Sequence, residues 1–376
     1  MDNSFRLFIL FLILFLFFYI VYRMIQKYRA KYSILEGYED PTVTQLHDNN
    51  LISPSITNVS DTTKKLPLKE LCIKASYNSA YNGYDIINTK EGANQYDMIE
   101  YVLSRGCRFL DFELYYHTTG DVVVNYTSDP TFTTFTNANP NKVTFSSVME
   151  YINTYYSSGD FIPNKSDPLF IHLRIKSDNP LIYDNIAGIL AEYKTNILKD
   201  TRINGDTKLS KLYDNNGNGN GNGKIVILMD RSIRPDDDIK STDENSLPTY
   251  ISAFTGMSSW SIDTYSEIKN QKTTPPKITN NDTNETNVTN LRIALPDIDP
   301  NSANPTSPFN FIEKNGIQTI ACRFYKHDIF LDLYEDLFAE HQSAFVPLAK
   351  AIKYIKRKKE DMGSRKMKLG PNIVHG

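Results

Sequence analysis

Short apolar segments alternate with amphipathic segments along most of this chain, and this alternation limits the possible folds more than any other feature. The segment from Leu66 to Ile355 therefore predicts one α/β domain, with the alternation of strands and helices expected of an α/β barrel. The expected strands are Leu71–Ser76, Phe109–Leu114, Asp121–Asn125, Leu169–Ile175, Lys224–Met229, Leu291–Leu295 and Thr319–Tyr325. The expected helices are Gln95–Ser104, Ser146–Tyr156, Tyr183–Tyr193 and Phe345–Ile355.

Composition narrows the class of protein. A chain of 376 residues, 40% hydrophobic and 23% charged, is large enough for one barrel-sized domain with appendages. Its net charge of -3 argues against a general nucleic-acid-binding protein, so no nucleic-acid partner is expected. The three cysteines, Cys72, Cys107 and Cys322, are odd in number and lie in apolar segments, which indicates buried, reduced thiols.

An uncharged apolar run from Leu7 to Val21 precedes the domain. With its neighbours it approaches the length of about 17 to 25 residues that a helix needs to cross a bilayer. A cleaved signal peptide is the competing interpretation, but no Ala-x-Ala-like cleavage site follows the run. We therefore expect residues 1–30 to form a single transmembrane anchor, and residues 31–65 to form a flexible polar linker.

Basic residues flank the apolar run unequally. Arg6 stands alone before it, whereas four basic residues follow it: Arg23, Lys27, Arg29 and Lys31. Because positive loops stay on the cytosolic side, the large domain is expected there. A second basic cluster lies in residues 356–376. Near a bilayer such a tail can hold anionic lipid with about 1 kcal/mol per basic side chain, or it can simply be solvated.

Charged residues also interrupt the expected strands. Asp111 and Glu113 point to the same side of their strand, because alternate side chains share a face. Their apolar neighbours fit a solvated strand face poorly, although that remains the simplest alternative. In the strand Leu169–Ile175, His172 and Arg174 share one face, and Lys176 continues it. Here His172 is either a hydrogen-bonded core residue or a catalytic base.

Four segments resemble the catalytic domain of phosphatidylinositol-specific phospholipase C, a member of the phospholipase C-like phosphodiesterases. The two more specific ones are Ala75-Ser76-Tyr77-Asn78-Ser79 and Gly106-Cys107-Arg108-Phe109-Leu110-Asp111-Phe112-Glu113. The supporting ones are Gly223-Lys224-Ile225-Val226-Ile227-Leu228 and Asn315-Gly316-Ile317-Gln318-Thr319-Ile320-Ala321. The resemblance spans nearly the whole domain and implies a TIM-type (β/α)8 barrel over residues 66–355.

This sequence departs from the family at both catalytic histidines. Those histidines take and supply protons during cleavage of the lipid phosphodiester, for which imidazole is suited near neutral pH. Tyr77 and Asn125 stand at their positions. Tyrosine, with a pKa of about 10, is a poor base, and asparagine does not titrate. His117, just beyond the acidic strand, is the remaining candidate that could replace the missing acid–base function.

The metal site of the family is also altered. In its calcium-dependent branch, the positions of Asn78, Asp111 and Glu113 bind the ion together with a glutamate from a later strand. Arg174 occupies the position that matches this glutamate. Since calcium requires six to eight oxygen ligands, we expect no calcium and no other cofactor. Arg174 is expected instead to pair with Asp111 or Glu113.

Three functions are consistent with these features. The favoured one is a membrane-anchored pseudoenzyme: a phospholipase C-like barrel that binds anionic lipid headgroups or a protein partner, or that is a structural component of a membrane or virus particle. The alternative is an active phosphoric diester hydrolase that uses substituted groups such as His172, Arg174 and Lys176. The third is a purely architectural membrane protein. The expected substrate-binding residues are Asn78, Asp111, Glu113, His172, Arg174 and Lys176.

Overall fold

The computed structural model divides the chain into a unit of residues 1–51 and a larger unit of residues 52–376. It describes Tyr19 and residues 56–81, 97–126, 143–158, 162–198, 203–213, 222–233, 245–298, 304–305 and 308–368. The predicted anchor, apart from Tyr19, and most of the predicted linker lie outside these ranges. Within them, no helix combines the length and the apolar character needed to cross a bilayer.

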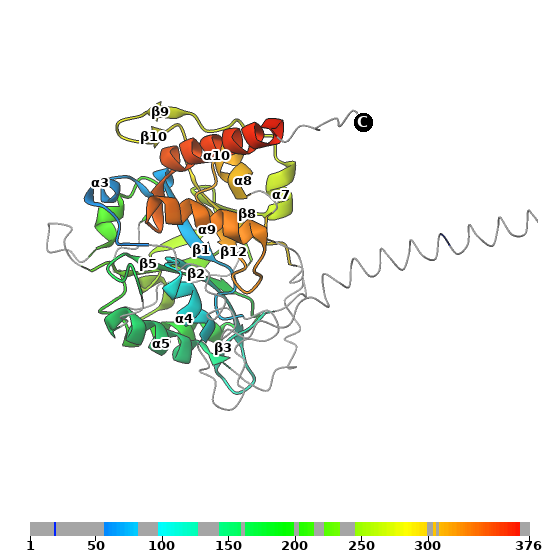
Figure 1. The fold of residues 1–376 in the computed structure, drawn as a ribbon. Coiled ribbons are helices and arrows are strands. Elements are labelled where there is room, and N and C mark those ends of the chain that lie inside the picture. Colours follow the sequence, from blue (N-terminus) through cyan, green and yellow to red (C-terminus); the bar gives the residue numbers. More distant parts are fainter. Residues whose placement is uncertain are drawn as a thin grey trace, which may run out of the picture. The chain divides into compact units, whose positions relative to one another are not determined.

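Eight parallel strands of the larger unit form a nearly closed barrel, which confirms the expected fold class for the described residues (Figure 1). They are β1 (Leu71–Ser76), β2 (Phe109–Tyr116), β5 (Leu169–Ile175), β6 (Ile225–Asp230), β7 (Ala253–Thr255), β8 (Trp260–Thr264), β11 (Leu291–Leu295) and β12 (Thr319–Cys322). Neighbours pair in the order β7, β6, β5, β2, β1, β12, β11, β8. Met257 and Trp260 form a bridge where the chain passes from β7 to β8, the two ends of this order.

Helices lie around the barrel and connect most of its strands (Figure 1). They are α3 (Asp61–Lys64), α4 (Asp97–Ser104), α5 (Phe145–Ser158), α6 (Leu181–Glu192), α7 (Tyr265–Asn270), α8 (Pro308–Asn315), α9 (Ile329–His341) and α10 (Leu348–Lys368). Three short 3₁₀ helices accompany them: η1 (Leu68–Glu70), η2 (Leu209–Leu212) and η3 (Leu247–Thr249). Alternating strand and helix is the arrangement that buries both faces of a parallel sheet.

Five further short strands lie outside the parallel path. β3 (Val122–Val124) and β4 (Val143–Thr144) extend the end of β2 in antiparallel fashion. β13 (Phe345–Pro347) pairs antiparallel with the start of β1. β9 (Ile278–Asn280) and β10 (Glu285–Thr286) form a separate hairpin.

The barrel interior has an apolar layer and a charged layer. Aromatic rings of Phe109, Phe170, Trp260 and Phe345 meet inside, with centroid distances from Phe170 to the other three of 6.3 to 6.4 Å. The next inward position of β2 after Phe109 is Asp111. The carboxyl end of the parallel strands is termed the mouth of the barrel and the amino end its base. The charged layer therefore lies on the mouth side of the aromatic layer.

Two predicted elements need correction. The segment Phe345–Ile355 was expected to be one helix, but its first three residues form β13. Phe345 and Val346 favour a strand, and pairing with β1 is available to them. The strand expected to reach Tyr325 ends at Cys322. In addition, α10 continues to Lys368, so much of the predicted basic tail is helical.

Candidate functional site

Parallel pairing of β2 with β5 brings the predicted site residues together. The register places Asp111 beside His172 and Glu113 beside Arg174. All four side chains are almost completely buried: Asp111 and His172 are 0% exposed, Glu113 is 1% exposed and Arg174 is 5% exposed. The side chains that were predicted to share one face of each strand therefore do so in the structure, and together they form a charged layer.

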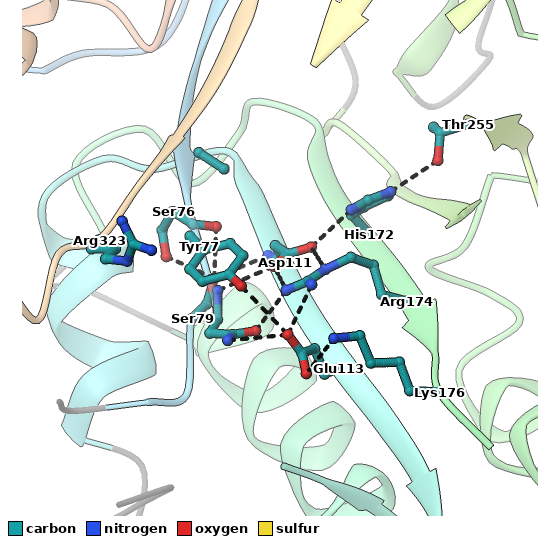
Figure 2. Close-up of polar contacts among 12 residues, drawn as sticks. Ser76, Tyr77, Ser79, Asp111, Glu113, His172, Arg174, Lys176, Thr255 and Arg323 are labelled. Carbon is teal, nitrogen blue, oxygen red and sulfur yellow. Dashed lines mark hydrogen bonds and ion pairs between the residues drawn. The ribbon is translucent and has the colours of Figure 1, made fainter. Parts of the chain in front are cut away.

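Arg174 lies at the centre of the site and pairs with both carboxylates, as predicted (Figure 2). Its Nε and Nη2 donate to the two oxygens of Asp111 at 2.8 and 2.6 Å. Its Nη1 donates to Glu113 Oε1 at 2.8 Å, and Nη2 also donates to Asn78 Oδ1 at 2.8 Å. A guanidinium that uses all its nitrogens in this way fixes the positions of the three side chains around it.

The remaining oxygens and nitrogens of the layer are also paired. Lys176 Nζ lies 3.0 Å from Glu113 Oε2, and the Tyr115 hydroxyl donates to the same oxygen at 2.9 Å. His172 Nδ1 lies 2.8 Å from Asp111 Oδ1, and its Nε2 lies 2.9 Å from Thr255 Oγ1. An ionised carboxylate has only acceptors, so His172 Nδ1 is the donor to Asp111.

A tight turn after β1 carries Asn78, the third residue that matches the family's calcium site. Asn78 has a φ of 42°, a left-handed conformation that asparagine tolerates better than most residues. Its backbone N–H donates to Asp111 Oδ2 at 3.2 Å, and Asp111 N–H donates to Ser79 Oγ at 3.0 Å. Ser76 Oγ in turn donates to Ser79 Oγ at 2.7 Å (Figure 2). The turn and the acidic strand are thus held to each other by several short contacts.

Tyrosine rings cover the charged layer at the mouth. The Tyr77 ring lies over the Arg174 guanidinium, with 4.7 Å between Cζ and the ring centroid, and Arg323 lies 5.5 Å from the same ring. Beyond it, Tyr81 stacks on Tyr126 at 5.3 Å and meets Tyr325 edge-on at 4.8 Å. These three residues come from separate segments of the chain. They are termed the tyrosine cover.

Protonation at this site is set by burial and by the ion pairs. Burial opposes ionisation of Asp111, but Arg174 and the hydrogen bond from His172 favour it more, so the pKa of Asp111 lies below its usual value. Burial likewise opposes ionisation of Glu113, but Arg174 and Lys176 hold its pKa below the usual value. Burial raises the pKa of Tyr77 above that of free tyrosine. Tyr77 is therefore a still weaker base in the fold than in solution.

The residues at the positions that match the family's calcium site do not fit the ion. Each oxygen of Asp111 and Glu113 already accepts from two or more donors, and Asn78 Oδ1 accepts from Arg174. Two carboxylates face two cations, so the layer is electrically balanced without a divalent ion. Over the described ranges, no cluster of three or more His, Cys, Asp or Glu side chains is arranged to hold a metal.

The residues at the positions that match the family's two catalytic histidines differ in their contacts. Tyr77 is 3% exposed, and its hydroxyl reaches Glu113 Oε1 only at 3.5 Å. Asn125 follows β3, and its Oδ1 accepts from the backbone N–H of Tyr126 at 2.7 Å. His117 lies in the turn between β2 and β3, where its Nδ1 is 2.7 Å from Thr119 Oγ1.

Two residues in contact with the layer were not predicted, Tyr115 and Thr255. Strand parity could have identified Tyr115, whereas Thr255 lies in a strand too short to show a pattern.

Fold and site together define a parallel α/β barrel whose mouth-side interior is filled by ion pairs. The sequence matches no known protein family and no curated protein. Solved structures do show similarity. PLC21 of S. officinalis is 13% identical with a TM-score of 0.47, covering 80% of this chain and 39% of its own. PLC21 of L. pealei is 13% identical with a TM-score of 0.46, covering 76% and 37%. Phosphatidylinositol-specific phospholipase C of Listeria monocytogenes is 13% identical with a TM-score of 0.41, covering 81% and 97%. The chain thus spans less than two fifths of the two PLC21 chains.

Proposed function

We propose that this protein is a membrane-anchored, catalytically inactive barrel of the phospholipase C type, which serves as a binding module or structural component. The observation that carries the proposal is the placement of Arg174. Its guanidinium pairs with Asp111 and Glu113 inside the barrel, where the resemblance in sequence implies that a functional enzyme would hold its catalytic groups.

The chemistry of the site supports inactivity in two ways. First, the positions that would transfer protons carry Tyr77 and Asn125; the pKa of the former is raised by burial, and the latter does not titrate. A well-placed acid or base contributes about 10² to 10⁴ in rate, so losing both removes most of the expected acceleration. Second, the ion pairs leave no carboxylate oxygen without a donor. The layer therefore stabilises the barrel rather than polarising a bound phosphodiester.

A hydrolysis assay tests the proposal directly. The purified full chain, incubated with phosphatidylinositol vesicles with or without calcium, should release no inositol phosphate. A variant with both Tyr77→His and Asn125→His should also remain inactive, because Arg174 and the tyrosine cover still fill the mouth. Turnover by the unmodified chain would contradict the proposal.

One observation favours the alternative of an active phosphoric diester hydrolase. Asp111, His172 and Thr255 follow one another at hydrogen-bond distance, in the order carboxylate, imidazole, hydroxyl. This order is that of a nucleophilic triad. However, all three side chains are 0% exposed, and Asp111 is also held by Arg174. Thr255→Val tests the alternative, because it abolishes any hydrolysis that depends on the hydroxyl.

A further inference from the structure

The base of the barrel carries a group of exposed lysines. Six of them form no ion pair with any other described residue: Lys65, Lys208, Lys211, Lys350, Lys353 and Lys356. They are termed the basal lysines. Pro67 bridges to Lys208, and α3 packs against both η2 and β13, so the segments that carry these residues adjoin one another. Lys65 and Lys350 line the same surface hollow of about 260 Å³.

Acidic residues near the basal lysines are fewer and partly neutralised. Asp61 pairs with Lys64 at 3.2 Å, and Asp206 pairs with Lys69 at 2.7 Å. Asp282 and Glu285 lie in the same hollow as Lys65 and Lys350. The balance at the base therefore remains positive, although the whole chain has a net charge of -3.

Over the described residues, the mouth carries more acidic than basic exposed side chains. Exposed Asp178 and Asp184 follow β5, and exposed Asp121 lies in the turn after β2. Among Lys and Arg, the exposed or half-exposed residues in the described loops at the mouth are Arg231, after β6, and Lys326, after β12. Charge is thus distributed unevenly along the axis of the barrel. Such a field orients a protein at a charged surface.

The first described residues of the larger unit contact the base of the barrel. Thr57 bridges to Ser343, and its N–H donates to Gln342 O at 2.9 Å, next to the start of β13. The 55 residues that precede Ile56 include the apolar run Leu7–Val21. The first described residues of the larger unit therefore lie at the same end of the barrel as the basal lysines.

We propose that the basal lysines dock the barrel on an anionic bilayer, with the mouth directed away from it. The occupant of this surface is the lipid headgroup layer, whose negative potential attracts lysines within about one Debye length. This inference rests on the proposed membrane location. It deepens that proposal because it assigns the face of the barrel that contacts the membrane.

Lysine footprinting on the full chain tests the docking. The chain is reconstituted in nanodiscs of phosphatidylcholine alone or with 30% phosphatidylserine, and acetylation is quantified by mass spectrometry. In anionic discs the basal lysines should react several-fold more slowly than in neutral discs, and Lys326 at the same rate. Raising the salt concentration to about 0.5 M should remove the difference, because screening shortens the reach of the charges.

Paired charge-reversal variants sharpen this test. Lys350→Glu with Lys353→Glu should abolish the protection of Lys65 and Lys208, whereas Arg231→Glu with Lys326→Glu at the mouth should leave it unchanged. Equal labelling in both discs, or protection of Lys326 instead of the basal lysines, overturns the docking. In the second case exposed Leu181, Ile298 and Ile329, which follow mouth-side strand ends, would be the contact. A chain that does not stay with neutral discs overturns the anchor and the docking together.

Discussion

Two buried ion-pair clusters in this barrel use the same chemistry in different places. The inner cluster consists of Asp111, Glu113, Arg174 and Lys176 inside the barrel, and it joins β2 to β5. The outer cluster joins β1 to its surrounding helices. There Lys74 Nζ lies 2.9 Å from Glu335 Oε1 on α9 and donates to Arg105 O at 2.6 Å, and Arg105 also pairs with Glu335. Both clusters are more than nine-tenths buried.

Charge balance separates the two clusters. The inner one sets two carboxylates against two cations, whereas the outer one sets a single carboxylate against two cations. The outer cluster attaches α9 and the end of α4 to the barrel, a packing role at a helix–sheet interface. The inner cluster joins two neighbouring strands inside the barrel, on the mouth side of the aromatic layer. The comparison shows that the same kind of ion pair can attach helices to the barrel at one place and fill the barrel interior at another.

Removing the central cation of the inner cluster should have the largest effect. Arg174→Leu leaves Asp111 and Glu113 buried with one fewer cation, and we expect the free energy of unfolding to fall by about 4 to 5 kcal/mol. Urea unfolding followed by circular dichroism measures the change. Arg174→Lys, which keeps the charge but loses the paired bonds, should recover only part of it. A loss below about 1 kcal/mol in the leucine variant would show that the inner cluster is not the structural element described here.

Removing the single anion of the outer cluster should have a somewhat smaller effect. Glu335→Gln leaves Lys74 and Arg105 without their carboxylate, but Lys74 keeps its bond to Arg105 O. We expect a loss of about 3 kcal/mol in the same unfolding experiment. Asp332→Asn, a half-exposed position on the same helix, is the control. If Glu335→Gln exceeded Arg174→Leu, the order of the two clusters would be reversed.

Much of the barrel could be predicted from the sequence because its central strands are long and apolar. The bounds of β1, β5 and β11 match the predicted strands. The short strands β7 and β13 were missed, since three residues show no periodicity. In β13 the apolar residues run directly into the amphipathic pattern of α10. The sequence therefore predicted one continuous helix, and β13 can be recognised only from its pairing with β1.

The inner cluster could be predicted because strand parity decides which charges share the interior. The period of two placed Asp111 and Glu113 on one face, and the resemblance to phospholipase C implied that Arg174 lies beside them. The tyrosine cover could not be predicted in the same way. Tyr81, Tyr126 and Tyr325 each follow the end of a different strand, and their contact depends on the curvature of the whole barrel. Local sequence carries no signal for such long-range ring contacts.

Acid should weaken both clusters, and the inner one more. The pKa values of Asp111, Glu113 and Glu335 are all lowered, by neighbouring cations that outweigh burial. A lowered folded pKa gives stability that is fully present above the unfolded value of about 4 and is lost as the pH falls through the folded value. Unfolding midpoints between pH 6 and 3 should therefore fall. Each unit of pKa difference contributes about 1.4 kcal/mol.

The variants assign this acid dependence to one cluster or the other. Arg174→Leu removes the main cause that lowers two carboxyl pKa values, so its stability should depend on pH less than that of the unmodified chain. Glu335→Gln removes one titrating group and should flatten the profile by a smaller amount. Profiles that run parallel for all three proteins would assign the acid sensitivity to other carboxylates.

An exposed ion pair should contribute least to the stability of the barrel. Arg357 on α10 lies 2.6 Å from Glu340 on α9, but their side chains are 60% and 44% exposed. Water and salt screen such a pair, and holding two long side chains in place costs entropy. Glu340→Gln should therefore leave the urea midpoint unchanged within error, at low salt as well as at high salt. A shift comparable to that of Glu335→Gln would mean that distance between charges, rather than their burial, determines the strength of these clusters.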